Sequence, residues 1–154
     1  MRRSKSEIYL HFVWATHRRE PFVSLKIEQA IYACILNEAQ CCKADVLAIG
    51  GTADHVHLLA KMPTSVSPAS LMQRVKGVSS TMGRQRLTDA GEFGWQDGYG
   101  VFSISRSHVK RVIDYVRNQK LHHETGKLWP EWEETDTEVP QEASHGSFAR
   151  YDQP

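Results

Sequence analysis

The order in which strand and helix signals follow one another is the feature that most constrains the fold of this chain. Strand signals are short runs rich in β-branched and aromatic residues, whereas helix signals are apolar stripes that recur every three or four residues. Strand signals occur at 8–15, 45–49, 55–61 and 99–105, and helix signals occur at 24–42, at 67–86 and from about residue 107 onward. This β-α-β-β-α-β order with an extra C-terminal helix predicts an α+β protein with a ferredoxin-like (RRM-like) antiparallel sheet, covered on one face by helices.

Turn and capping residues mark the boundaries of these elements. The glycine-rich segment Gly50-Gly51-Thr52 favours a tight antiparallel hairpin between the second and third strands. Ser67 followed by Pro68 is typical of a helix start. Residues 1–132 form the predicted domain, whereas residues 133–154 are acidic and polar without apolar periodicity, so we predict a flexible tail there.

Composition limits the classes of protein to which the chain can belong. Its 154 residues, 40% of them hydrophobic, suffice for one domain with a proper core. Neither a signal-peptide pattern nor the roughly 20 apolar residues of a membrane span is found, so we expect a cytoplasmic protein without a membrane partner. The three cysteines, Cys34, Cys41 and Cys42, have no CxxC spacing, which argues against a thiolate zinc site.

The charge is distributed unevenly along the chain. Up to Pro130 there are 18 Lys and Arg against 11 Asp and Glu, a balance of +7. The remaining residues hold one Arg against 7 acidic residues, a balance of −6. A basic domain attracts polyanions, nucleic acid first among them, although such an excess is also typical of an ordinary solvated surface.

Two histidines alternate with apolar residues in the third predicted strand, Asp54-His55-Val56-His57-Leu58-Leu59. Because residues i and i+2 of a strand share a face, His55 and His57 point together and away from the helices. The same alternation directs Asp54 away from both imidazoles. Two neutral imidazoles on one face can chelate a divalent ion when a third ligand comes from elsewhere. The alternative is a pair of polar residues on an exposed face of the sheet.

The last predicted helix carries a tyrosine and a glutamine one turn apart. Its apolar residues at i, i+3, i+4 and i+7 define the face that docks on the rest of the domain. Tyr115 and Gln119 fall together on a flank about 90° from the centre of that face, so we expect Tyr115 to be half packed. The alternative is an ordinary amphipathic flank on which Gln119 is solvated.

Four segments, in this order, give the chain a specific resemblance. They are Tyr9-Leu10-His11-Phe12-Val13-Trp14-Ala15-Thr16, the His55 segment, Trp95-Gln96-Asp97-Gly98-Tyr99-Gly100-Val101-Phe102-Ser103 and Tyr115-Val116-Arg117-Asn118-Gln119. Together they resemble the IS200/IS605 family of single-domain transposases, the Y1 branch of the HUH nucleases, including the REP-associated tyrosine transposases. The resemblance covers roughly residues 7–129.

The resemblance implies roles for individual residues. His55 and His57 match the metal-binding histidines, Gln119 the remaining protein ligand and Tyr115 the nucleophile. Mg²⁺ or Mn²⁺ is the implied cofactor, because neutral ligands leave the charge of the ion free to polarise a phosphate. Attack by Tyr115 would give a 5′-phosphotyrosine, from which strands are rejoined without a nucleotide cofactor. The residue that activates Tyr115 is not identifiable from sequence, and where some family members carry a further ligand before the histidines this chain has Ala53.

The resemblance also implies partners. Family members bind single-stranded DNA with imperfect hairpins and work as homodimers in which active sites are shared between subunits. Candidates for phosphate contact in this chain are Arg18, Arg19, Arg74, Lys76, Arg84 and Arg86. Trp95 and Tyr99 are aromatic residues that can stack on bases or pack locally.

Three hypotheses therefore remain open at the level of sequence. The first is an active transposase that cleaves and rejoins DNA, either in a mobile element or as a palindrome-processing relative retained by the host. The second is a decayed, non-catalytic DNA-binding member of the same fold. The third is an unrelated metal-dependent hydrolase that uses the histidine pair.

Overall fold

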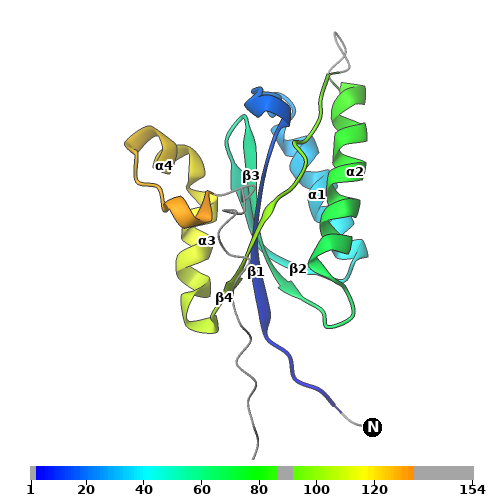
Figure 1. Cartoon of the computed structure of the whole chain (residues 1–154), viewed down its shortest axis with the longest axis vertical. Coiled ribbons are helices and arrows are strands. Elements are labelled where there is room, and N and C mark those ends of the chain that lie inside the picture. The colour runs from blue at the N-terminus through cyan, green and yellow to red at the C-terminus, as the bar shows by residue number, and fades with distance from the viewer. Residues whose placement is uncertain (1–2, 87–91, 134–154) are drawn as a thin grey trace, which may run out of the picture.

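Four strands and four α-helices make up the domain in the computed structural model, which describes residues 3–86 and 92–133. The strands are β1 (Ile8–Ala15), β2 (Asp45–Gly51), β3 (His55–Met62) and β4 (Gly100–Ile104). The helices are α1 (Glu28–Cys41), α2 (Pro68–Arg86), α3 (Val109–Arg117) and α4 (Gln119–Thr125). Short 3-10 helices occupy His17–Arg19, Arg106–His108 and Pro130–Trp132. Figure 1 shows the sheet standing between α1 and α2 on one side and α3 on the other.

The sheet is antiparallel with the order β2-β3-β1-β4. The central pair runs from Ile8 opposite Met62 to Ala15 opposite His55, so β3 is hydrogen-bonded along its whole length. The prediction of an α+β, ferredoxin-like antiparallel sheet is confirmed, but the expectation that helices cover only one face is wrong, because α3 packs on the other face. The order of the two inner strands places β3, with its two histidines, in the middle of the domain.

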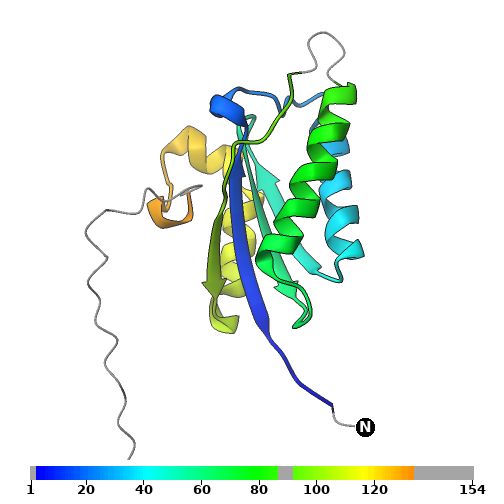
Figure 2. The ribbon, with the colours of Figure 1, turned by 45° about the vertical axis from the view of Figure 1, so that its right-hand side comes forward.

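Each face of the sheet has its own apolar core. Val56, Leu58 and Ala60 of β3 pack with α1 and α2 in the larger core, as strand alternation predicts. Leu59 points to the opposite face and packs with Val112 and Val116 of α3. The two views in Figures 1 and 2 agree that α3 lies across this second face. The C-terminal helix therefore docks on the face that also carries the histidines.

The C-terminal region differs from a single continuous helix. Asn118 interrupts it with a ψ of 27°, and a new helix, α4, begins at Gln119. Gly126, with φ of +68°, then ends α4 in the left-handed conformation that glycine adopts readily. The chain consequently turns back, and the 3-10 helix Pro130–Trp132 returns toward α3.

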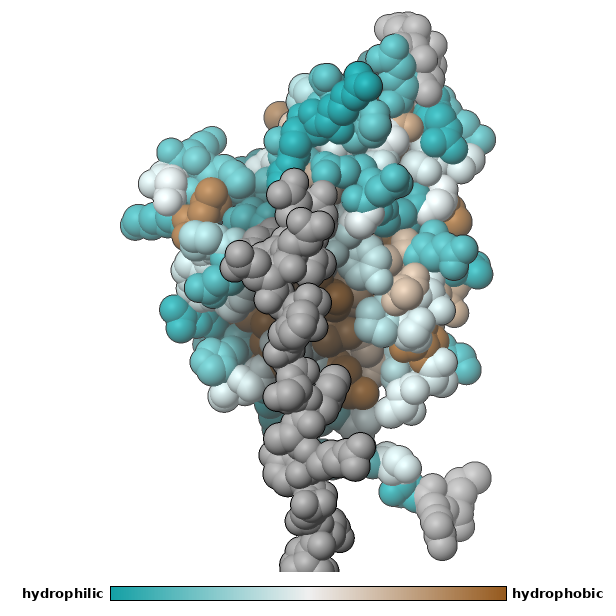
Figure 3. Space-filling view, in the orientation of Figure 1, coloured by the Kyte–Doolittle hydropathy of each residue, from teal (hydrophilic) through white to brown (hydrophobic). Residues whose placement is uncertain are grey.

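The surface is mostly hydrophilic in the view of Figure 3, with a hydrophobic area near its lower centre. Exposed hydrophobic side chains include Ile8 of β1 and Val101 of β4. Among the described residues, none of the helices combines the length and apolar character needed to cross a membrane.

Candidate active site and metal centre

β3 holds the two histidines of the candidate site on the face covered by α3. His55 is 1% exposed and His57 is fully buried, so neither belongs to a solvated sheet surface. Gly50 of β2 lies opposite His57 in the sheet. A Cβ at Gly50 would lie 2.0 Å from the carbonyl oxygen of Val116, so the missing side chain is what lets α3 approach the sheet here.

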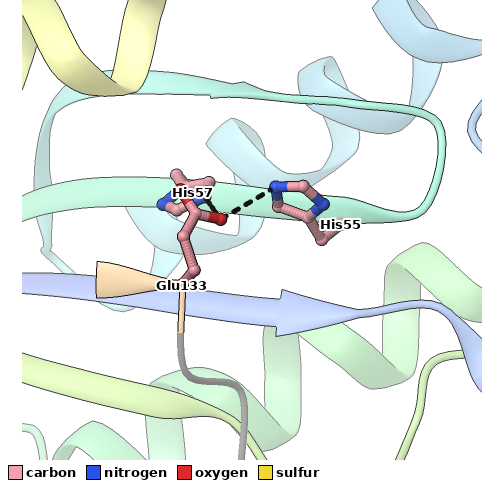
Figure 4. A group of neighbouring side chains, drawn as sticks. All are labelled: His55, His57 and Glu133. Atoms are coloured by element: carbon pink, nitrogen blue, oxygen red, sulfur yellow. Dashed lines mark hydrogen bonds and ion pairs between the residues drawn. The ribbon is translucent and has the colours of Figure 1, made fainter. Parts of the chain in front are cut away.

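Glu133 completes a three-residue cluster with the histidines. Its Oε2 lies 3.3 Å from Nε2 of His55 and 3.3 Å from Nε2 of His57. Figure 4 shows the carboxylate of Glu133 reaching toward the two rings from the end of the 3-10 helix Pro130–Trp132. Among the described residues this is the group with the geometry of a metal centre, and one ligand atom from each of its members lies within 4.8 Å of the others.

The donor atoms fit a divalent ion. Adjacent ligands of an octahedral ion at about 2.1 Å are roughly 3.0 Å apart, close to the spacing between the carboxylate and each imidazole. Oε1 of Gln119 is buried and has no hydrogen-bond partner in the described part of the chain, and Nε2 of His55 is buried with Oε2 of Glu133 3.3 Å away. Orphaned lone pairs of this kind are costly unless something else binds them. Two imidazole nitrogens with oxygen donors form a mixed set that can hold a divalent ion, and the oxygen donors are of the kind that Mn²⁺ and Mg²⁺ prefer.

The far side of the His55 ring is anchored by the turn before β3. Nδ1 of His55 lies 2.6 Å from Oδ1 of Asp54 and 2.9 Å from Oγ1 of Thr52. The prediction that Asp54 points away from both histidines is wrong. Asp54 precedes the first residue of β3, so strand alternation does not apply to it, and its carboxylate orients the imidazole in the manner typical of metal-binding histidines.

Burial and the carboxylates set the charge of the histidines. Burial lowers the pKa of His57 to about 4. Burial also lowers the pKa of His55, but Asp54 and Glu133 outweigh it and raise that pKa above its ordinary value. The hydrogen bond from His55 holds the pKa of Asp54 at about 2. Burial raises the pKa of Glu133, yet hydrogen bonds from the two histidines hold it well below its ordinary range, so this carboxylate is ionised.

Tyr115 of α3 lies beside this cluster in the same chain. Its hydroxyl donates a hydrogen bond to Oε1 of Glu133 and accepts one of 3.1 Å from the backbone N–H of Trp129. The centroid of its ring is 5.9 Å from that of His57. Burial and the hydrogen bond to Glu133 raise the pKa of Tyr115 to about 12. The phenol is therefore protonated when the site is at rest.

Aromatic rings hold the tyrosine in place. Its ring is nearly parallel to those of His122, 4.9 Å away, and Trp129, 5.0 Å away, and the edge of Trp132 approaches it as well. Tyr115 is only 3% exposed, so the prediction of a half-packed side chain is wrong. Helical geometry alone placed it on a flank, but the returning segment after α4 covers that flank.

Gln119, the predicted third ligand, is also buried, at 1% exposure. It is the first residue of α4, and its Nε2 donates a 3.1 Å hydrogen bond to the backbone oxygen of Tyr115. The structure thus brings His55, His57, Tyr115 and Gln119 into one region within a single chain.

Sequence reasoning missed three residues of this region. Glu133 was assigned to the flexible tail, whereas it contacts His55, His57 and Tyr115, and the rest of that tail, 134–154, lies outside the described residues. His11 of β1 contacts His57, and His123 of α4 lies 3.5 Å from Glu133. The sequence did contain a signal for a chain reversal here, because Gly126 is typical of a helix end. Trp129 and Trp132 follow it in a polar stretch, and two large aromatic side chains need a surface to pack on.

The predicted phosphate-binding residues are dispersed. Arg74 forms an ion pair of 2.6 Å with Glu38, and Nζ of Lys76 donates hydrogen bonds to the carbonyls of Gln96 and Gly98. Both cations therefore already have structural partners. The guanidinium of Arg19 lies 3.8 Å from Asp54, next to the histidine pair.

The other cations are exposed. Arg18 belongs to the 3-10 helix after β1, Arg86 ends α2, and Arg84 joins Lys76 and Trp95 in lining a pocket of about 260 Å³. Trp95 and Tyr99 both pack against the larger core, and the indole of Trp95 donates to Ser79.

Two histidines, a carboxylate that could hold a metal ion with them, and a buried tyrosine are thus gathered on one face of a four-stranded antiparallel sheet. The family model described as "Transposase IS200 like" matches residues 4–119, and the chain belongs to this family. The transposases of insertion sequence IS200 from Salmonella typhimurium (strain LT2) and from Salmonella typhi are each 31% identical to it over 96 residues. These matches cover 58% of this chain and 55% of each relative, so the chain spans about half the length of these relatives.

Two solved structures share the fold. A putative transposase from Deinococcus radiodurans superimposes with a TM-score of 0.61 at 19% identity, covering 77% of this chain and 98% of that one. A REP-associated tyrosine transposase bound to a REP hairpin superimposes with a TM-score of 0.59 at 16% identity, covering 84% of this chain and 79% of that one. Both comparisons support the α+β fold described above.

Proposed function

We propose that this protein is a DNA transposase that cleaves and rejoins single-stranded DNA through a covalent bond to Tyr115. The observation that carries the proposal is the contact of one carboxylate, Glu133, with both the tyrosine hydroxyl and the histidine pair. A nucleophile and a set of metal-binding donors are thereby held in one buried region. Membership of the transposase family is consistent with this chemistry.

Tyr115 acts as the nucleophile in this proposal. Its oxygen forms a bond to phosphorus while the bond from phosphorus to the 3′ oxygen breaks, which leaves a 5′-phosphotyrosine and a free 3′-OH. Oε1 of Glu133 is the nearest acceptor for the phenolic proton. The stacked rings of His122 and Trp129 fix the direction of attack. A 3′-OH that later attacks the phosphotyrosine restores the phosphodiester and frees Tyr115, so no nucleotide cofactor is consumed.

We propose that His55 and His57 bind the metal ion through Nε2, with Gln119 and Oε2 of Glu133 as the oxygen ligands. The contacts of 3.3 Å from Nε2 of both histidines to Oε2 of Glu133 and the unpartnered, buried Oε1 of Gln119 support this assignment. A bound Mg²⁺ or Mn²⁺ supplies positive charge that polarises the scissile phosphate.

The proposed substrate is single-stranded DNA that carries an imperfect hairpin. A structural neighbour with the same fold is bound to a REP hairpin, which supports this class of substrate. Arg19 is the best placed of the predicted phosphate contacts, because its ion pair with Asp54 puts it beside the site. A homodimer with shared active sites remains a prediction. The contact between Tyr115 and His57 in one chain means that a partner subunit is not needed to bring these two residues together.

The proposal is tested by incubating the protein with Mn²⁺ and single-stranded DNA that carries the palindrome flanking its gene. We expect a protein–DNA adduct that survives denaturant and is absent from Tyr115→Phe. Tyr99→Phe is the matched control, because Tyr99 packs on the core away from the site, and it should retain the adduct.

Two other outcomes would point to the remaining hypotheses. Cleavage that depends on metal but forms no adduct would favour a hydrolase. Binding of the strand without cleavage would favour a decayed DNA-binding protein, and an undiminished adduct in Tyr115→Phe would exclude Tyr115 as the nucleophile.

A further inference from the structure

A third histidine, His11, lies behind the histidine pair and has no assigned role. It belongs to β1, is fully buried, and its ring stacks on His57 with centroids 5.1 Å apart. Its Nε2 lies 2.8 Å from Nδ1 of His57, which is the distance of a good hydrogen bond. The other nitrogen, Nδ1 of His11, is buried without a partner in the described part of the chain.

The 2.8 Å contact constrains where the protons of the two rings lie. A neutral imidazole has one N–H donor and one lone pair, so one ring must donate across this contact and the other must accept. If Nε2 of His57 gives its lone pair to a metal ion, its proton must be on Nδ1. His57 then donates to Nε2 of His11, and His11 carries its own proton on Nδ1.

The unpartnered nitrogen argues against a purely structural role for His11. A buried polar atom without a hydrogen bond costs about 1–3 kcal/mol, and an apolar ring would pack against Phe102 and Trp132 without that cost. What a phenylalanine could not supply is an acceptor for Nδ1 of His57. The feature that justifies a histidine here is therefore its lone pair.

We propose that His11 is a positioning residue that fixes the orientation and tautomer of His57 and so presents Nε2 of His57 to the metal ion. This inference rests on the proposed metal-binding role of His57. His11 does for His57 what Asp54 does for His55, but with a neutral group. Outer hydrogen bonds of this kind typically change metal affinity by about 10-fold to 100-fold.

Mn²⁺ affinity of the DNA-free protein tests the proposal, measured from the electron paramagnetic resonance signal of free Mn²⁺. His11→Phe should weaken binding about 10-fold to 100-fold. His11→Gln, whose side-chain oxygen can accept from Nδ1 of His57, should recover most of the affinity. Phe102→Leu is the control for altered packing around His11, because Phe102 packs on the ring of His11 but takes no part in the hydrogen bond. This variant should bind Mn²⁺ with the affinity of the native protein.

A second measurement keeps the test decisive if His11→Phe fails to fold. In the native protein loaded with Mg²⁺, ¹⁵N chemical shifts of the imidazoles should show His57 protonated on Nδ1. A proton on Nε2 of His57 under these conditions would overturn the proposal, and so would native Mn²⁺ affinity in folded His11→Phe. His57→Ala tests the metal-binding role of His57 separately from the positioning role of His11. If this variant binds Mn²⁺ as tightly as the native protein, the proposed ligand set is wrong.

Discussion

Replacing Gly50 by alanine should damage the site without touching any of its residues. The added Cβ would lie 2.0 Å from the carbonyl oxygen of Val116, whereas such contacts do not fall below 3.0 Å, so α3 or β2 must retreat by about 1 Å. Overpacking of this size costs about 1–3 kcal/mol of stability. Because Tyr115 precedes Val116 in α3, the same retreat moves the tyrosine away from His57, and a misplacement of about 1 Å can lower a rate by roughly 10²-fold.

Gly77→Ala is the matched control for this prediction. Gly77 lies in α2 and has nothing within 4 Å of the position that its Cβ would occupy, so the change should be neutral or should raise stability by up to about 1 kcal/mol. Urea denaturation measures the stability of both variants, and the initial rate of adduct formation measures their activity. If Gly50→Ala matches the native protein in both assays, the close packing of α3 on β2 does not position Tyr115.

Three further predictions follow from individual contacts. Glu133→Gln should weaken Mn²⁺ binding by about 10-fold in a calorimetric titration, because it removes the carboxylate charge that contacts both histidines. The same change at the exposed neighbour Glu131 should leave the affinity unchanged, and equal affinities of the two variants would exclude Glu133 from the metal centre. Arg74→Ala should lower the free energy of unfolding measurably in urea denaturation, because Glu38 is only 8% exposed and loses its ion-pair partner. Arg84→Ala should leave the free energy of unfolding unchanged within the error of the same measurement. Burial lowers the pKa values of His11 and His57 to about 3 and about 4, so the unfolded chain takes up protons first as pH falls below about 6.5. Metal-free protein should then lose up to about 1.4 kcal/mol of stability per pH unit for each of these histidines; unchanged urea midpoints between pH 7 and pH 5 would contradict their neutral burial.

Local sequence patterns predicted the orientation of a side chain correctly where that orientation depends on the backbone of a single strand or helix. The period of two in β3 correctly separated His55 and His57 from Val56 and Leu58, because strand alternation is a property of the backbone itself. The apolar stripe of the last helix likewise identified the residues of α3 that dock on the sheet. The order of strand and helix signals predicted the fold, and these two patterns predicted which residues face the sheet, the helices and the site.

The parts that sequence could not predict depend on where the chain returns in space. The position of Glu133 depends on the chain reversal at Gly126 and on the packing of Trp129 on Tyr115. Hydrophobic periodicity does not predict where a chain packs after such a reversal. Asp54 was misplaced because a rule for strands was applied to a turn residue. The expectation that active sites are shared between subunits came from the family resemblance and stays a prediction, while the rings of His57 and Tyr115 lie 5.9 Å apart within one chain.

The identity of the residue that bonds to DNA tests the central claim most directly. The denaturant-stable adduct should be digested with protease and nuclease, and the modified peptide sequenced by mass spectrometry. The account predicts a single nucleotide or short oligonucleotide joined through its 5′ phosphate to Tyr115. A phosphate on another residue, or a linkage through the 3′ end of the DNA, would contradict it.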